Sequence, residues 1–244
     1  MTASKSKTIQ PKPTNPPETL ENHIFYGMKL DDEQKAFRDA IWSDQYDVVV
    51  CESVAGSGKT TTAIATAILL CEYGKYNGII YQIAGGVYES KQGLLPGTID
   101  EKSRPLFAPL YQAVARLGYD PMRMIYTGEN IISLKDGGAM ITAQSDSYIR
   151  GTSFGEHDDK KIIILDEAQN LITPAMRTTI TRVNAGSKLI VLGQQKQCDL
   201  KFPGDSGFPR FREVFQKAEQ EGWCKFCSLT HNYRGRVSAL GDTI

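Results

Sequence analysis

The chain has 244 residues and carries 28 lysines and arginines against 28 aspartates and glutamates, so a formal net charge of zero argues against a wholly basic, histone-like surface but not against a local basic patch. Hydrophobic residues make up 41% and charged residues 23%, a composition that excludes general disorder. No stretch approaches the roughly 18 apolar residues of a membrane span, and no secretory signal is visible. The five cysteines are too few, and odd in number, for a disulfide scaffold. We therefore expect a cytoplasmic protein without a membrane partner.

The N-terminal 20 residues contain four prolines and few apolar side chains. Such a segment buries too little apolar surface to fold, so we expect residues 1–20 to form a flexible tail. No internal repeat or second change of composition follows. We therefore expect residues 21–244 to form a single domain.

Strand-like and helix-like segments alternate along this domain. An acidic cap at Asp31 or Asp32 precedes an amphipathic helix whose apolar stripe begins at Ala36. After it, the pattern predicts strands over 47–51, 78–83, 139–143, 161–166, 187–192 and 224–229, and helices over 59–72, 98–117, 174–183 and 211–221. The strands are apolar on both faces, which indicates an α/β fold with a mostly parallel central sheet between two helical layers.

The strongest motif is a glycine-rich segment, residues 55–61, directly between the first strand and a helix. Its glycines let backbone N–H groups turn toward phosphate oxygens, and the following helix adds N-terminal donors. Lys59 is expected to contact the β- and γ-phosphates and Thr60 to bind Mg²⁺. The alternative is a glycine turn that only joins the strand to the helix. The predicted nucleotide-binding residues of this loop are Ser53, Ala55, Gly56, Ser57, Gly58, Lys59, Thr60 and Thr61.

Position 53 departs from the usual phosphate-loop pattern. The pattern has glycine there, whereas this chain has Ser53. If the backbone at this position were left-handed, serine would be strained. We therefore expect the loop to begin with a slightly different shape.

Two acids end the buried strand predicted over 161–166. Asp166 and Glu167 would lie at the carboxyl edge of the sheet, where open α/β sheets bind ligands. Asp166 is the expected Mg²⁺ ligand, and Glu167 is expected to polarise the attacking water. The alternative is a pair of solvated acids at a strand end.

Two glutamines are candidates for nucleotide recognition. Gln197, which follows the strand over 187–192, is placed to sense a γ-phosphate. Gln34 lies in a segment that looks like an adenine-reading motif, in which an amide both donates to and accepts from adenine. No Asn-Lys-x-Asp guanine signature occurs, which favours ATP. A surface amide is the alternative for each glutamine.

Taken together, these segments resemble the PhoH family of P-loop ATPases. The most diagnostic stretch is 93–102, which continues through Pro105 to Tyr111, and residues 148–152 and 165–170 match further family segments. Residues 166–169, Asp-Glu-Ala-Gln, also resemble motif II of superfamily 1 helicases. The resemblance implies a P-loop NTPase with a RecA-like, three-layer α/β/α core that uses ATP and Mg²⁺.

The resemblance also implies partners and two catalytic arginines. The implied partner is single-stranded nucleic acid, with RNA favoured over DNA. The implied assembly is a ring-like homo-oligomer, for example a hexamer. Residues 229–234 look like a helicase motif whose arginine, here Arg234, contacts the γ-phosphate, and Arg150 is the second such candidate. For both, a surface ion pair is the alternative. Two other functions stay open: a nucleotide-gated scaffold with negligible turnover, and a kinase acting on a small acceptor.

Overall fold

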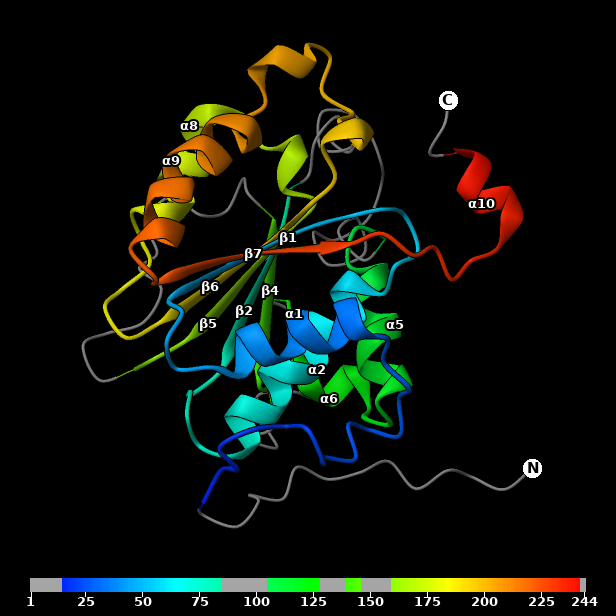
Figure 1. The fold of residues 1–244 in the computed structure, drawn as a ribbon, viewed down its shortest axis with the longest axis vertical. Helices are drawn as coiled ribbons and strands as arrows, with labels where there is room; N and C mark the ends of the chain where they lie inside the picture. Colours follow the sequence, from blue (N-terminus) through cyan, green and yellow to red (C-terminus); the bar gives the residue numbers. More distant parts are fainter. Residues whose placement is uncertain (1–14, 85–104, 128–138, 146–158, 242–244) are drawn as a thin grey trace.

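The computed structural model describes residues 15–84, 105–127, 139–145 and 159–241. In these ranges, strands form one sheet of order β3-β4-β2-β5-β6-β1-β7, and all neighbouring strands run parallel (Figure 1). The strands are β1 Val48–Ser53, β2 Ile79–Ile83, β3 Ile125–Tyr126, β4 Ile141–Ser145, β5 Ile162–Asp166, β6 Lys188–Gly193 and β7 Cys224–Leu229.

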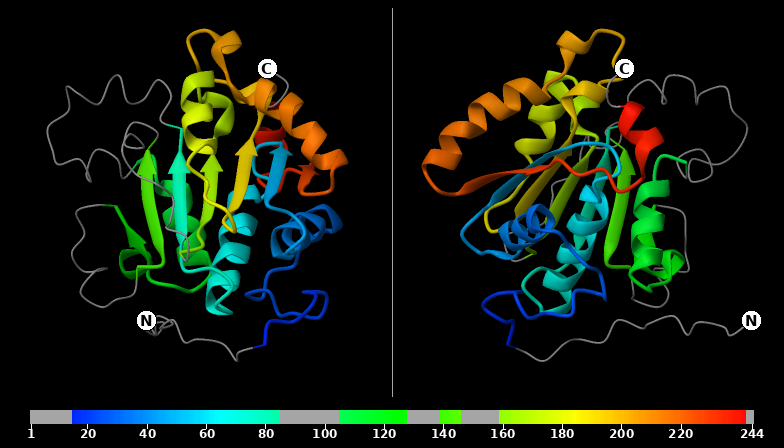
Figure 2. Two further views of the ribbon diagram at one scale, coloured as in Figure 1. Left: turned by 90° about the vertical axis from the view of Figure 1, so that its left-hand side faces the viewer. Right: turned by 45° about the vertical axis from the view of Figure 1, so that its right-hand side comes forward.

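Helices cover both faces of the sheet. Helices α1, α2, α5 and α6 lie on one face and α8 and α9 on the other, whereas α10 projects beyond the end of β7 (Figures 1 and 2). The helices are α1 Asp32–Trp42, α2 Lys59–Glu72, α5 Ala108–Arg116, α6 Pro121–Met124, α8 Thr173–Ile180, α9 Phe208–Gln220 and α10 Arg236–Gly241. Within the described residues, short 3₁₀ turns lie near the carboxyl edge: η2 Ala168–Asn170, η3 Gln195–Gln197 and η4 Pro203–Asp205.

Two apolar cores result from the alternation of side chains along the buried strands. In β1, Val49 and Cys51 pack with the α1, α2 and α5 layer, whereas Val48 and Val50 pack with the α8 and α9 layer. Because successive side chains point to opposite faces, a strand covered on both sides must be apolar throughout. This confirms the predicted α/β fold, with a parallel central sheet between two helical layers.

Some predicted boundaries differ from the structure. The helix expected over 98–117 begins at Ala108 in the structure. Pro109 lies in its first turn, where the N–H that proline lacks would have no partner within the helix. Residues 98–104 lie outside the described ranges. At the N-terminus, Leu20 is fully buried and the Trp42 indole donates to the Pro17 carbonyl oxygen at 3.1 Å. The chain therefore contacts the domain earlier than the tail boundary at residue 20 implied.

The sheet order determines which loops meet. Strand β6 lies between β1 and β5, so the segment after β6 sits between the loop after β1 and the acids that end β5. All three strands are parallel and present their carboxyl ends at one edge, where ligands bind in open α/β sheets. Within the described ranges, no helix is both long and apolar enough to cross a bilayer.

Candidate nucleotide-binding site

The glycine-rich loop connects β1 to α2 in a shape that requires its glycines. Gly56 and Gly58 adopt φ angles of +69° and +84°, a left-handed conformation that side chains disfavour. As the N-cap of α2, Gly58 has no side chain to cap the helix, so the first N–H groups of α2 are left to an anion. The loop has the geometry of a phosphate cradle.

Ser53, which stands where the usual phosphate-loop pattern has glycine, is part of the strand that precedes the loop. It is the last residue of β1, is paired in register with Leu229 of β7, and is buried. It is not among the described residues with positive φ. The left-handed backbone that would strain a serine is therefore not adopted at position 53, because this residue still belongs to β1.

Asp166 and Thr60 are in direct contact. The Thr60 hydroxyl donates to Oδ2 of Asp166 at 2.9 Å, and the fully buried Tyr81 hydroxyl donates to the same oxygen at 2.7 Å. Burial and the neighbouring Asp166 raise the pKa of Tyr81 well above its usual value, so this hydroxyl keeps its proton and remains a donor. A buried carboxylate next to a hydroxyl is a set of oxygen donors that fits Mg²⁺.

Glu167 lies close to Lys59 in an unusual backbone conformation. Its φ is +53°, and its carboxylate is 3.8 Å from the Lys59 ammonium nitrogen. Burial, and to a lesser degree the neighbouring Asp166, raise the pKa of Glu167. A left-handed glutamate costs free energy, and such strain concentrates at functional sites.

The Gln169 side chain connects Glu167 to the segment after β6. Its amide nitrogen donates to Glu167 at 2.7 Å and to the Gln197 carbonyl oxygen at 3.2 Å, and its amide oxygen accepts from the Gln194 N–H at 2.9 Å. Gln169 is completely buried, whereas Gln197 is exposed on η3. Gln197, the expected γ-phosphate sensor, is thus linked to Glu167 through its own backbone carbonyl and the Gln169 amide.

Arg234 lies across the phosphate loop. A Cβ atom built on Gly56 would lie only 2.7 Å from Cγ of Arg234, and the Tyr233 N–H donates to the Gly56 carbonyl oxygen at 3.1 Å. The segment after β7 is therefore held against the loop. The second expected arginine, Arg150, lies outside the described residues.

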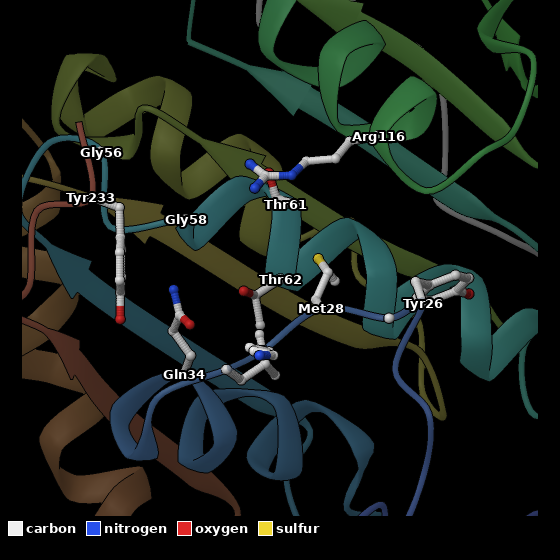
Figure 3. A pocket seen from close by; sticks show the side chains of 12 residues that line it. Tyr26, Met28, Gln34, Gly56, Gly58, Thr61, Thr62, Arg116 and Tyr233 are labelled. Atoms are coloured by element: carbon white, nitrogen blue, oxygen red, sulfur yellow. The ribbon is translucent and has the colours of Figure 1, made fainter.

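A cavity of about 500 Å³ opens beside this loop (Figure 3). Gln34, Tyr233 and Arg116 are among the residues that line it. Gln34 is buried; its amide nitrogen donates to the Ser57 carbonyl oxygen at 2.8 Å and its amide oxygen accepts from the Asp31 N–H at 3.2 Å. One N–H and one lone pair of the Gln34 amide stay available for a base.

The structure thus brings together Gln34, residues 53–61, the two acids and Arg234. Sequence reasoning missed three contributors: Tyr81, Gln169 as a link to Glu167, and Arg116. For Gln169 a signal existed in the Asp-Glu-Ala-Gln run. A tyrosine in an apolar strand and an arginine at a helix end carry no comparable signal.

The comparison with known families decides the classification. A family described as "PhoH-like protein" matches residues 28–239. The chain belongs to the PhoH family. The chain is 32% identical over 203 residues to a PhoH-like protein of Mycobacterium leprae, covering 83% of this chain and 49% of the relative. It is 30% identical over 194 residues to Protein PhoH of Escherichia coli, covering 79% and 51%. This PhoH family member thus spans about half the length of these relatives.

Solved structures with similar folds share little sequence with this PhoH family member. The Sulfolobus solfataricus SWI2/SNF2 ATPase core in complex with dsDNA aligns with a TM-score of 0.48 and 13% identity, covering 82% of this chain and 45% of that chain. The HK97 bacteriophage large terminase aligns with a TM-score of 0.46 and 17% identity, covering 82% and 39%. The family, the phosphate loop and the sheet identify the protein as a P-loop NTPase.

Proposed function

We propose that this NTPase hydrolyses ATP with Mg²⁺ as its cofactor. The observation that supports this most is the position of Glu167, a carboxylate with a raised pKa beside Lys59 and directly after Asp166. A carboxylate whose pKa is raised is a stronger proton acceptor, and this suits it to take a proton from the attacking water. The alternative, a nucleotide-gated scaffold with negligible turnover, has no need for that base.

Each residue has a distinct task in this reaction. The N–H groups around Gly58 bind phosphate oxygens. Lys59, which lies close to Glu167, contacts the β- and γ-phosphates once ATP is bound. Mg²⁺, held by Thr60 and Asp166, would neutralise charge on the phosphates. Glu167 accepts one proton as the water oxygen bonds to the γ-phosphorus, while the bond to the β–γ bridging oxygen breaks and ADP leaves.

Two further residues complete the proposed site. The always-charged Arg234 guanidinium is suited to contact the γ-phosphate from above the loop. Gln34 lines the adjoining cavity and has one donor and one acceptor left for an adenine edge. The latter supports ATP as the substrate.

Phosphate release from ATP tests this function. We expect Lys59→Ala to lower turnover by about 100-fold, because the donor that contacts the transferred phosphate is lost. Lys217→Ala, on the exposed side of α9, serves as the matched control and should keep full activity. If the wild type and Lys59→Ala release phosphate equally slowly, the ATPase proposal fails and the scaffold alternative gains.

We also propose that turnover is coupled to single-stranded nucleic acid, RNA in the first place. Phe202 is 61% exposed between η3 and η4, with the Lys201 ammonium nitrogen 5.4 Å from its ring centroid. The same segment is fastened to the acid motif, since the Ser206 hydroxyl donates to the Gln169 carbonyl oxygen at 2.8 Å. An exposed aromatic ring next to a cation is suited to stack on a base.

Stimulation of phosphate release by oligonucleotides measures this coupling. Residues 195–205 carry two lysines and two aspartates, so stacking rather than charge should dominate and salt should weaken binding little. We expect Phe202→Ala to lower affinity for single strands by about 10-fold without changing basal turnover, and Val214→Ala on α9 to change neither. Single-stranded RNA, single-stranded DNA and duplex serve as separate arms. Unchanged affinity in Phe202→Ala would exclude this surface.

We further propose that the protein acts as a homo-oligomer, with a hexamer as one form. Val237 and Leu240 of α10 are 87% and 65% exposed and lie three residues apart, on one face of the helix. Adjacent exposed apolar side chains are typical of contact surfaces. Light scattering should give a mass several-fold above 27.0 kDa, and a monomer with full activity would contradict the proposal.

A further inference from the structure

The flat side chains that line the cavity beside the phosphate loop include Tyr233 and Arg116, which come from different elements. Tyr233 comes from the segment after β7, and Arg116 is the last residue of α5. Figure 3 shows the Arg116 side chain directed from α5 toward the N-terminal turn of α2, where Thr61 lies, with Gln34 on a third wall. A planar ligand that extends from the phosphate loop would enter the space between them.

Tyr233 is held in place by its neighbours. Its hydroxyl donates to the Asp31 carboxylate, and its ring packs edge-on against His231 with centroids 4.4 Å apart. The side chain is nevertheless 54% exposed. One side of the cavity is thus a fixed aromatic surface that other protein groups leave partly uncovered.

Arg116 makes no ion pair with any of the described acidic residues, and its side chain is exposed. By contrast, Arg38 pairs with Asp39 at 2.7 Å and Arg212 with Glu52 at 2.8 Å. The described residues that line the cavity include no carboxylate. The guanidinium is therefore available to a bound molecule.

The Gln34 amide by itself offers a base in this cavity only a few hydrogen bonds. Gln34 already binds the Ser57 carbonyl oxygen and the Asp31 N–H, which leaves it a single donor and a single acceptor. Met28 and Leu30, which also line the cavity, offer only apolar side chains. A base bound here would therefore also gain free energy from contact with flat and apolar surfaces.

We propose that Arg116 stacks on the base of the bound nucleotide, on the side opposite Tyr233. This proposal rests on the proposed nucleotide site and assigns to α5 a role in recognising the base rather than the phosphates. A guanidinium is planar, permanently charged and weakly hydrated, so it stacks on aromatic rings where a lysine ammonium does not. The ligand class is a purine nucleotide, whose two-ring base offers the larger stacking surface.

Binding of ATP and of inorganic tripolyphosphate, measured by calorimetry on the full chain, separates base from phosphate recognition. We expect Arg116→Ala to weaken ATP binding by about 5- to 10-fold and to leave tripolyphosphate binding unchanged within about 2-fold. Arg116→Lys should resemble Arg116→Ala, because charge without a plane cannot stack. Arg177→Ala, an exposed arginine on α8, is the matched control and should bind both ligands like the wild type.

Three results would overturn the proposal: unchanged ATP affinity in Arg116→Ala, an equal loss for tripolyphosphate, or wild-type ATP affinity in Arg116→Lys. Alanine favours helices at least as well as arginine, so an exposed helix position should tolerate the change, and equal melting temperatures check this. Failure of ATP hydrolysis is a separate outcome. A protein that binds ATP through Arg116 without hydrolysing it refutes the ATPase proposal and supports the base contact.

Discussion

Replacing Glu167 by glutamine should nearly abolish phosphate release while ATP binding persists. Glutamine has the same shape as glutamate, tolerates the same left-handed backbone and can still accept the hydrogen bond from Gln169. What it cannot do is accept the proton of the attacking water. General-base catalysis is worth about 10²- to 10⁴-fold, so we expect turnover to fall by that factor.

ATP affinity is the internal control for this variant. Lys59 loses its nearby carboxylate charge in Glu167→Gln, so its ammonium group is more available to phosphates and the affinity should stay equal or increase. Glu213→Gln, on the exposed surface of α9, is the matched substitution and should have wild-type turnover. Calorimetry measures the ATP affinity, and phosphate release measures the turnover. A Glu167→Gln variant that turns over normally would exclude Glu167 as the base.

The same residue predicts a pH dependence. Burial, with the neighbouring Asp166, raises the pKa of Glu167, so the base is protonated and inactive at pH values where an exposed glutamate is still charged. As the pH falls, kcat/KM of the wild type should therefore begin to fall above the usual glutamate range. In Glu167→Gln the residual activity should lack this acidic limb.

The site motifs were predictable because their chemistry is local in the chain. A loop with glycines at positions 56 and 58 followed by Lys59 needs no tertiary information to indicate a phosphate cradle, and an apolar strand that ends in two acids indicates a carboxyl-edge site. The parallel sheet followed from strands that are apolar on both faces. The distance between the phosphate loop and the two acids could not be predicted in this way, because it depends on β6 lying between β1 and β5.

The missed features depend on long-range contacts or very short elements. Tyr81 contacts Asp166 across 85 positions of sequence, and its place in an apolar strand is equally typical of core packing. Strand β3 has two residues and α6 has four, too few to show a hydrophobic period. Arg116 belongs to the site only because α5 packs against α2.

Gly56 should not tolerate even one added methyl group. Its φ of +69° disfavours any side chain, and a Cβ atom there would lie 2.7 and 2.9 Å from Cγ and Cδ of Arg234 and 3.0 Å from the Asn232 side-chain oxygen. The Tyr233 N–H bond to the Gly56 carbonyl oxygen holds that segment in place, so the collision cannot be relieved without moving the loop or the arginine. We expect Gly56→Ala to weaken nucleotide binding by at least about 10-fold.

Gly74→Ala separates backbone strain from this collision. Gly74 has nearly the same angle, φ +70°, but a Cβ atom there meets nothing within 4 Å. Gly74→Ala should therefore cost only about 1–2 kcal/mol of stability and leave nucleotide binding intact. Because of the collision, Gly56→Ala should also lower the melting temperature. Adding Arg234→Ala removes the two closest carbons and should restore part of that loss, although turnover stays low because the guanidinium is gone. If Gly56→Ala and Gly74→Ala bind nucleotide equally well, the close packing of Arg234 on the phosphate loop is not required for function.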